Sequence, residues 1–127
     1  MRLARPLTIL ALAAAACSAL AGPTAAPVRA EIDRLLARLQ ASGCQFNRNG
    51  SWYDGAQARS HLLRKLEAIE ARGTVQNTEQ FIQLAASGSS VSGKPYLVRC
   101  GTAPVVESRQ WLTEQLALVR NAAPRKP

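Results

Sequence analysis

CQFNRNGSWY, residues 44–53, is the clearest β-hairpin signal in a chain whose other patterns are mostly helical. Residues 44–48 alternate like a strand that is buried on one face. Asn49-Gly50 is the residue pair most typical of a two-residue type I′ turn, in which both positions need positive φ angles. Residues 51–53 read as the returning strand. We therefore expect two antiparallel strands here.

One helix is expected before the hairpin and one after it. The first begins at Ala30, ends at Ser42-Gly43 and repeats its apolar residues at helical spacing: Ile32, Leu35, Leu36 and Leu39. Asp54 is suited to the N-cap of the second helix, which runs to about Arg72 before Gly73. The apolar face of this helix is Ala58, Leu62, Leu66 and Ile69.

The C-terminal half predicts two helices separated by a strand. Asn77 and Gln80 resemble a capping box at the start of the third helix, whose expected buried face is Phe81, Ile82, Leu84 and Ala85. A Ser/Gly segment over 87–93 ends it, and PYLVRC (95–100) is rich in strand formers. After a loop through Pro104, Ser108 caps the last helix, with an apolar arc of Trp111, Leu112, Leu116, Leu118 and Val119.

The element order is helix, hairpin, helix, helix, strand, helix. This order predicts a single small α+β domain in which a small antiparallel sheet is packed by helices.

The first 21 residues are typical of an export signal. Arg2 and Arg5 precede an apolar run over 7–16, and residues 19–21 (Ala-Leu-Ala) give the A-x-A cleavage pattern. The run is shorter than the roughly 20 residues of a membrane span. We expect a signal peptide over 1–21, a loose lead-in over 22–29, the domain over 30–120, a disordered basic tail over 121–127, and a periplasmic location. Cleavage near Ala30 and lipidation of Cys17 stay open as alternatives.

The charge of the chain narrows the class of partner that the protein can bind. The chain has 16 Lys and Arg against 8 Asp and Glu, a net charge of +8, and loss of Arg2 and Arg5 would leave +6. The charges are scattered, with no basic helix face carrying aromatic residues, so we expect no nucleic-acid partner. An anionic ligand or a partner protein of the cell envelope fits better, although such a charge can also serve solubility alone.

Removal of the signal peptide would leave two cysteines, Cys44 and Cys100. In an oxidising compartment this pair predicts a disulfide, which would hold the first hairpin strand beside the late strand. A metal site would need histidine partners, and the single histidine, His61, lacks a matching spacing. We expect no metal and no cofactor.

GSSVSGKPY, residues 88–96, is nearly a nucleotide-binding P-loop, G-x-x-x-x-G-K-[ST]. Here, however, the segment follows a helix and precedes a strand, and Pro95 stands where a hydroxyl would hold magnesium. It is therefore not a P-loop. Its glycines, serines and Lys94 can still bind an anion through backbone amides. The alternative is a turn whose serines satisfy local backbone groups.

Four blocks in a fixed order resemble the YfeK-like family of small periplasmic proteins, a domain of unknown function. The blocks are FNRNG (46–50), AQARSHLLRKL (56–66), TEQFIQLAAS (78–87) and SSVSGKPYLVRC (89–100). The resemblance covers residues 31 to about 120 and implies an envelope location without an established activity. The matching positions are Arg48, Asn49, Gly50, His61, Leu62, Lys65, Phe81, Ile82, Ser87, Ser90, Gly93, Lys94, Pro95 and Tyr96. Some relatives lack the cysteine pair, which implies that the disulfide supports the fold.

Polar residues of these blocks form the candidate ligand site. His61 and Lys65 are four residues apart, so they lie on the same side of the second helix, and Arg48 at the hairpin can approach them. The full candidate set is Arg48, His61, Lys65, Ser87, Ser90, Lys94 and Tyr96. The alternative for the histidine is a hydrogen-bonded packing role, and for Arg48 and Lys65 it is solvation or a salt bridge.

Two classes of function stay open. The first is a non-catalytic module that binds an anionic envelope ligand or a partner protein. The second is a small periplasmic hydrolase in which Ser87, Ser89, Ser90 or Ser92 is activated by His61. Candidate carboxylates exist at Asp54, Glu67 and Glu107, but no spacing connects them to His61, and G-x-S-x-G is absent. The sequence favours binding and assigns no catalytic residue.

Overall fold

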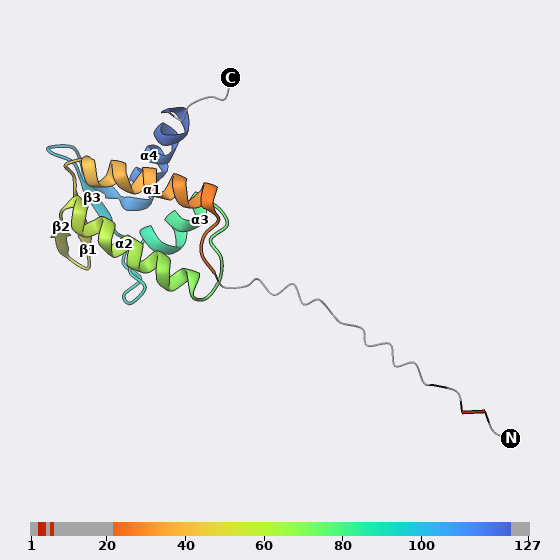
Figure 1. The fold of residues 1–127 in the computed structure, drawn as a ribbon. Helices are drawn as coiled ribbons and strands as arrows, with labels where there is room; N and C mark the ends of the chain where they lie inside the picture. Colours follow the sequence, from red (N-terminus) through yellow and green to blue (C-terminus); the bar gives the residue numbers. More distant parts are fainter. Residues whose placement is uncertain (1–2, 5, 7–21, 123–127) are drawn as a thin grey trace.

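The computed structural model describes residues 3–4, 6 and 22–122 (Figure 1). Most of the expected signal peptide, including Cys17 and the A-x-A pattern, lies outside the described residues, as do residues 123–127 of the expected tail. The elements in chain order are α1 (Ala26–Ala41), β1 (Gln45–Arg48), β2 (Ser51–Tyr53), α2 (Gly55–Glu70), α3 (Thr78–Phe81), the π-helical turn η1 (Ile82–Ala86), β3 (Leu97–Arg99), β4 (Val106–Glu107) and α4 (Ser108–Ala122). The expected α+β class and small antiparallel sheet are confirmed.

The sheet has the strand order β2-β1-β3-β4, and every neighbouring pair is antiparallel. The hairpin turn has the expected geometry, with a φ of 50° at Asn49 and 86° at Gly50. Phe46 pairs with Tyr53 on one side and with Val98 on the other. Because Phe46 and Val98 are buried, this row of residues faces the helices.

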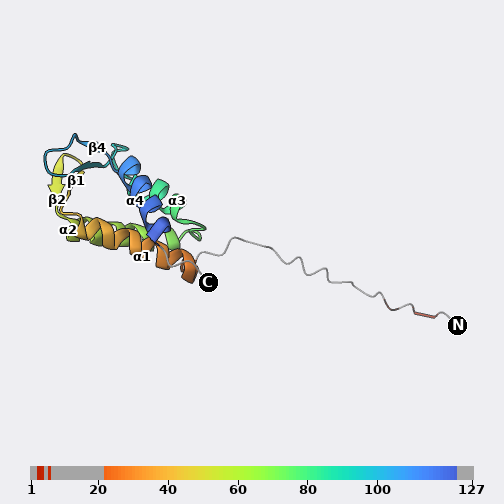
Figure 2. The same cartoon turned by 90° about the horizontal axis from the view of Figure 1, so that it is seen from above.

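The helices cover one face of the sheet and enclose the core with it. Figures 1 and 2 show the strands gathered at one end of α1 and α2, which run side by side, while α3 and α4 complete the helical layer. The rings of Phe46 and Trp111 meet edge to face with centroids 5.6 Å apart, which joins the sheet to α4. Fully buried core residues come from every helical segment and from β3: Ile32, Leu35, Leu36, Leu39, Leu66, Phe81, Ala85, Ala86, Val98 and Leu112.

The N-cap of α2 matches the prediction, whereas the start of α3 differs. Asp54 accepts from the backbone N–H of Gln57, and the Gln57 side chain accepts from the backbone N–H of Asp54, which completes a capping box. At α3, Asn77 accepts from the backbone N–H of Gln80, but the Gln80 side chain accepts from Gln76 instead of Asn77. The second box is therefore incomplete.

Four details differ from the sequence-based expectation. First, α1 begins at Ala26 rather than Ala30, because a proline in its first turn is compatible with a helix. Second, β4 adds a two-residue strand where a loop was expected. Third, Leu84 and Leu118 are 47% exposed, since each lies well away from the buried arc of its helix. Fourth, α4 continues through Ala122, into the segment expected as a tail.

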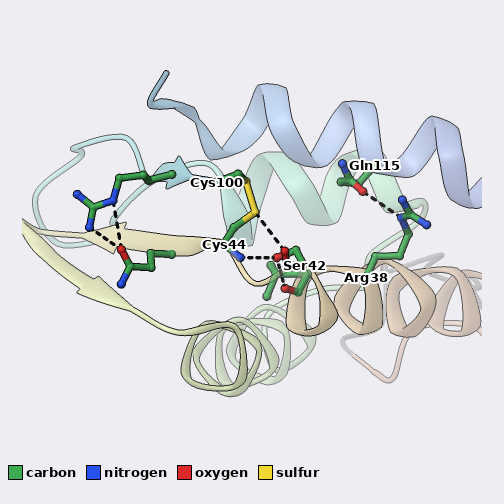
Figure 3. The surroundings of a disulfide bond; sticks show 8 residues. Arg38, Ser42, Cys44, Cys100 and Gln115 are labelled. Carbon is green, nitrogen blue, oxygen red and sulfur yellow. Dashed lines mark hydrogen bonds between the residues drawn. A yellow bond between two sulfur atoms is a disulfide. The ribbon is translucent and has the colours of Figure 1, made fainter. Parts of the chain in front are cut away.

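The predicted disulfide joins Cys44 and Cys100, one residue beyond the paired residues Gln45 and Arg99. It therefore holds β1 beside β3, as expected. Figure 3 shows the bond next to Ser42, just after the C-terminal end of α1. Ser42 accepts from the backbone N–H of Cys44 at 3.1 Å and donates its hydroxyl to the carbonyl of Leu39 at 2.7 Å. The disulfide thus lies where the sheet meets α1.

Side-chain contacts also fix the ends of the helices. Thr24 is buried, and its hydroxyl donates to Glu70 at the end of α2 over 2.9 Å, so part of the expected loose lead-in is attached to the domain. Arg120 of α4 pairs with Glu31 of α1 and Glu79 of α3. In the described part of the chain, no helix combines the length and apolar character that a bilayer crossing requires.

Gly55 sets the distance between the start of α2 and the end of α1. A Cβ atom at this position would lie 2.8 Å from the carbonyl oxygen of Gln40 and 3.0 Å from that of Leu39. Both contacts are with backbone atoms, which cannot rotate away. The first turn of α2 can therefore approach α1 closely only because residue 55 has no side chain.

Candidate functional site

A cavity of about 400 Å³ lies between the hairpin, α2 and the N-terminal side of β3. Apolar side chains form much of its wall, and no Asp or Glu is among its lining residues. Those residues are Phe46, Asn47, Arg48, Tyr53, Ala56, Gln57, Ala58, Ser60, His61, Leu62, Arg64, Tyr96 and Ser108. The wall therefore combines apolar surface with polar groups, and its charged residues, Arg48 and Arg64, are both positive.

Arg48, the last residue of β1, places a half-buried guanidinium group at this cavity. Its Nη1 contacts Nδ1 of His61, and its Cζ lies 4.7 Å from the centroid of the Tyr53 ring. Within the part of the chain that the structure describes, Arg48 forms no ion pair. The guanidinium is thus held by an imidazole and an aromatic ring rather than by a carboxylate.

The contacts of His61 determine which ring nitrogen carries its proton. Arginine can only donate, so Nδ1 must accept from Arg48 and carries no proton in the neutral ring. The proton of the neutral ring therefore lies on Nε2, which donates to the Tyr96 hydroxyl at 3.0 Å. The hydrogen bonds run in one direction, from Arg48 through His61 to Tyr96.

Lys65 reaches the same tyrosine from the next turn of α2. Its Nζ donates to the Tyr96 hydroxyl at 3.1 Å and to the carbonyl of Gly88 at 2.8 Å. Both acceptors are neutral, and the ammonium also lies 4.8 Å from the centroid of the Tyr96 ring. Lys65 therefore anchors the 87–94 loop and Tyr96 to α2, behind the cavity wall.

Burial and the neighbouring cations shift the pKa values of the cluster in directions that keep His61 and Tyr96 neutral. Burial, followed by the charges of Arg48, Lys65 and Arg64, lowers the pKa of His61 to about 4. Burial and then Arg48 lower the pKa of Lys65. Burial raises the pKa of Tyr96, against the smaller opposing effect of Arg48. The site is a set of cations around neutral hydrogen-bonding groups.

The Ser/Gly loop uses its amides within itself. The Ser89 hydroxyl, which is buried, accepts from the backbone N–H groups of Val91 and Ser92, each at 3.2 Å. The N–H of Gly93 donates to the carbonyl of Ser89 and that of Lys94 to the Ser92 hydroxyl. Four backbone N–H groups that could bind an anion are thus already occupied. This favours the interpretation of the loop as a turn whose serines satisfy local backbone groups.

The structure brings together four of the seven candidate residues: Arg48, His61, Lys65 and Tyr96. The other three lie elsewhere in the fold. Ser87 donates its hydroxyl to the carbonyl of Ile82 at 2.7 Å and so closes the π-helical turn. Ser90 and Lys94 are exposed on the loop. Asn49, expected to serve the turn alone, also bonds the loop through Ser89 and Ser92.

Sequence reasoning missed Tyr53 and Arg64 as lining residues. The sequence placed Tyr53 in the returning strand and gave it no role in the site. In the hairpin it lies diagonally across from Arg48 on the same face, a position that allows side-chain contact. Arg64 follows His61 by three residues on α2, a spacing that places two side chains on neighbouring parts of a helix surface. Both signals were present in the sequence.

Metal-binding groups do not gather in the described residues, where no three His, Cys, Asp or Glu side chains are placed to hold an ion. His61 also has both ring nitrogens engaged, by Arg48 and by Tyr96. The chemistry that the cluster can offer is hydrogen-bond donation and positive charge.

The chain is similar to a curated protein and to a protein family. The chain is 41% identical over 68 residues to the uncharacterized protein YfeK of Salmonella typhimurium, and the match spans 53% of this chain and 55% of that protein. The match thus spans about half the length of this curated relative. No solved structure matches the chain. The family of unknown function DUF5329 matches residues 26–120, so the chain belongs to that family.

Proposed function

We propose that this protein is a non-catalytic binding module of the periplasm whose cavity holds an anionic ligand against Arg48. The observation that carries this proposal is the half-buried guanidinium of Arg48, which lines the cavity and has no carboxylate partner among the described residues. A cation that is partly removed from water is stabilised by a nearby anion. A bound ligand anion would provide that stabilisation.

Two further cations strengthen the positive field at this site. Lys65 donates only to neutral oxygens, and Arg64 lines the cavity without an ion pair in the described chain. Charge-assisted hydrogen bonds to a carboxylate or phosphate are stronger than bonds between neutral groups. The ligand expected here therefore carries negative charge.

The hydrolase alternative has less support. In a serine triad the histidine accepts from the serine and donates its other N–H to a carboxylate. Here Nδ1 faces the Arg48 cation, and Nε2 bonds a phenol. A histidine whose pKa is about 4 is also a weak general base at neutral pH. These contacts favour a positioning role for His61 over a catalytic one.

The proposed location rests on two features. The first 21 residues have the pattern of an export signal, and the fold contains a disulfide, a bond that persists in oxidising compartments. Cell fractionation of a tagged full-length chain would test the location. Recovery with cytoplasmic markers, with both cysteines reduced, would contradict it.

Thermal unfolding with a panel of envelope anions tests the function. The panel contains phosphate, sulfate, soluble peptidoglycan fragments and phosphorylated sugars of lipopolysaccharide. A ligand at 100 times its dissociation constant should stabilise the protein by about 2.7 kcal/mol, which raises the melting temperature measurably. We expect at least one anion to do so in the wild type and to lose the effect in Arg48→Gln.

Two variants control this experiment. Lys94→Gln removes an exposed cation of the 87–94 loop, and Arg109→Gln removes an exposed cation of α4. Both should respond to ligand as the wild type does. Loss of the response in Lys94→Gln but not in Arg48→Gln would place the site on the loop. No response to any anion of this panel, and none to an organic carboxylate, would contradict small-anion binding and favour a partner protein.

A further inference from the structure

We infer that the cavity takes an organic monocarboxylate with a compact apolar body, its carboxylate on Arg48 and its body against Phe46 and Leu62. This inference rests on the anion-binding function proposed above and names the class of anion. It follows from the charge, the wall chemistry and the size of the cavity.

The charge available in the cavity matches one negative group. Arg48 is the half-buried cation of the lining, whereas Arg64 is exposed, and Lys65 lies behind Tyr96 outside the lining. A guanidinium presents N–H donors in a planar fork that fits the two oxygens of a carboxylate. The second charge of a dianion would depend on the solvent-screened Arg64. The charge pattern thus favours a monoanion.

The donors that a phosphate or sulfate group requires are scarce at this cavity. Oxyanion sites commonly use several backbone N–H groups at a helix N-terminus or in a loop. In the first turn of α2 the Gln57 amide is already bonded to Asp54, and no residue of the 87–94 loop lines the cavity. The half-buried cationic donor of the lining is therefore the guanidinium fork of Arg48 rather than a cradle of loop amides.

The walls favour a ligand that has an apolar part. Phe46 and Leu62 are buried core residues that also line the cavity, and Ala58 and the Tyr53 ring extend this apolar surface. A hydrocarbon or aryl group would remove the remaining exposed surface of these side chains from water, whereas a fully hydrated ion would not. Pockets for small molecules commonly combine such walls with a few polar groups that fix orientation.

The volume also exceeds that of a simple ion. At about 400 Å³ the cavity falls within the range of small-molecule sites, roughly 300–1,000 Å³, and is far larger than one carboxylate or phosphate group. The carboxylate of a bound ligand can therefore reach Arg48 while its apolar body fills the space toward Leu62. A compact ring or a short branched chain meets this requirement.

Calorimetry with a matched probe series tests the class of ligand. Phenylacetate carries the anion and the ring, phenylacetamide carries the ring without charge, phenethylamine reverses the charge, and inorganic phosphate lacks the ring. We expect phenylacetate to bind the oxidised protein at least roughly tenfold more tightly than each of the others, because charge-assisted hydrogen bonds are stronger than bonds between neutral groups. Arg48→Gln should remove this preference, and Arg109→Gln should retain it.

A second variant separates the cavity from the charge. Ala58→Leu leaves every cation in place and introduces a residue that also favours helix, but it adds side-chain volume to the cavity wall. It should weaken phenylacetate binding while circular dichroism shows an unchanged fold. Unchanged affinity in Ala58→Leu would overturn the placement of the ligand body. This variant also tests the inference if Arg48→Gln does not fold.

The other outcomes distinguish the two proposals. Equal binding of phosphate and phenylacetate, both lost in Arg48→Gln, would overturn the monocarboxylate class and leave anion binding intact. Equal binding of phenylacetate and phenylacetamide, both retained in Arg48→Gln, would overturn both proposals. Absence of phenylacetate binding at millimolar concentration would overturn the class inference alone if an anion of the envelope panel binds through Arg48.

Discussion

At the scale of single residues, His61 holds Arg48 only while its ring is neutral. Nδ1 accepts from Arg48 and Nε2 donates to Tyr96, so each nitrogen has a fixed role. A proton added to Nδ1 would remove the acceptor and place a third cation beside Arg48 and Lys65. The low pKa of His61 expresses the cost of that change.

We expect the stability of the protein to fall as the pH drops from about 6.5 toward 4 because of His61. The pKa is 6.5 in the unfolded chain and about 4 in the fold, so the unfolded state binds more protons within this window. The contribution of neutral His61 to stability is complete above pH 6.5 and is lost progressively as the pH falls to about 4. A loss of about 1–2 kcal/mol is expected, discounted because the ring is partly exposed.

Urea unfolding across this pH window, compared with His61→Gln, measures the contribution. The comparison is needed because Glu31 and Glu79 also have lowered pKa values, owing mainly to hydrogen bonds from Arg120, and lose stabilisation at lower pH. Glutamine can accept from Arg48 without titrating. Identical pH dependence in the two proteins, or an NMR titration of His61 near 6.5, would contradict the assignment.

Residue types and helical spacing predicted that Arg48, His61 and Lys65 lie close together, and their hydrogen bonds to one another or to a shared tyrosine place them so. The spacing of His61 and Lys65 placed both on one side of α2, and the turn brought Arg48 toward them. The roles of Ser87 and Lys94 could not be predicted, because they depend on which backbone groups the folded loop leaves free. Ser87 bonds the carbonyl of Ile82, five residues earlier, a partner that exists only once the π-helical turn forms.

At the scale of elements, α2 carries the wall of the cavity, and its start is fixed by Asp54. We expect Asp54→Ala to lower the free energy of unfolding by about 1 kcal/mol, because the N-cap side chain satisfies an otherwise unpaired amide. Urea unfolding measures this change. Glu67→Ala, an exposed acidic residue on the same helix, is the matched control and should have little effect. Equal losses in both variants would argue against a capping contribution.

Long periodic segments could be predicted from the sequence, and short or irregular ones could not. The four buried leucine and isoleucine positions of α1 repeat over several turns, so the helix was identifiable. Strand β4 has only Val106 and Glu107, too few residues to show a period of two. The π-helical turn η1 is only five residues long, and its buried residues would fit an α-helix equally well. The sequence therefore contained no pattern that distinguishes it from an α-helix.

At the scale of the whole molecule, the disulfide joins two halves of the chain that the sheet already pairs. We expect Cys44→Ser with Cys100→Ser to lower the free energy of unfolding by about 4 kcal/mol, chiefly by freeing the unfolded chain. The fold should persist, because β1 and β3 still pair and the core is unchanged. Urea unfolding and circular dichroism measure both properties.

Reduction of the wild type provides the control for this pair of substitutions. Reduced wild type and the double variant should unfold at the same urea concentration if the covalent bond alone accounts for the loss. Unfolding that is unaffected by reductant would contradict a stabilising disulfide. Complete loss of structure in the double variant would contradict the view that the core suffices for folding.

The strand order follows from features that the sequence partly contained. The hairpin gave the β1–β2 pair, and the cysteine pair placed β3 beside β1. What was missing is the outer neighbour β4, which pairs with β3 through Val106 and Val98 immediately before α4. Strand β4 pairs with β3 only because the folded loop over residues 100–105 brings the chain back beside β3. The path of that loop cannot be predicted from local composition.

The contact at Gly55 has a consequence for engineering this scaffold. Ala58, His61 and Leu62 all project from α2 into the cavity or its wall, so the tilt of that helix determines the shape of the cavity. That tilt is set against backbone atoms of α1, which no change of side chain can move. Ligand preference can therefore be redesigned at Ala58 and Leu62, one position at a time, provided that Gly55 is kept.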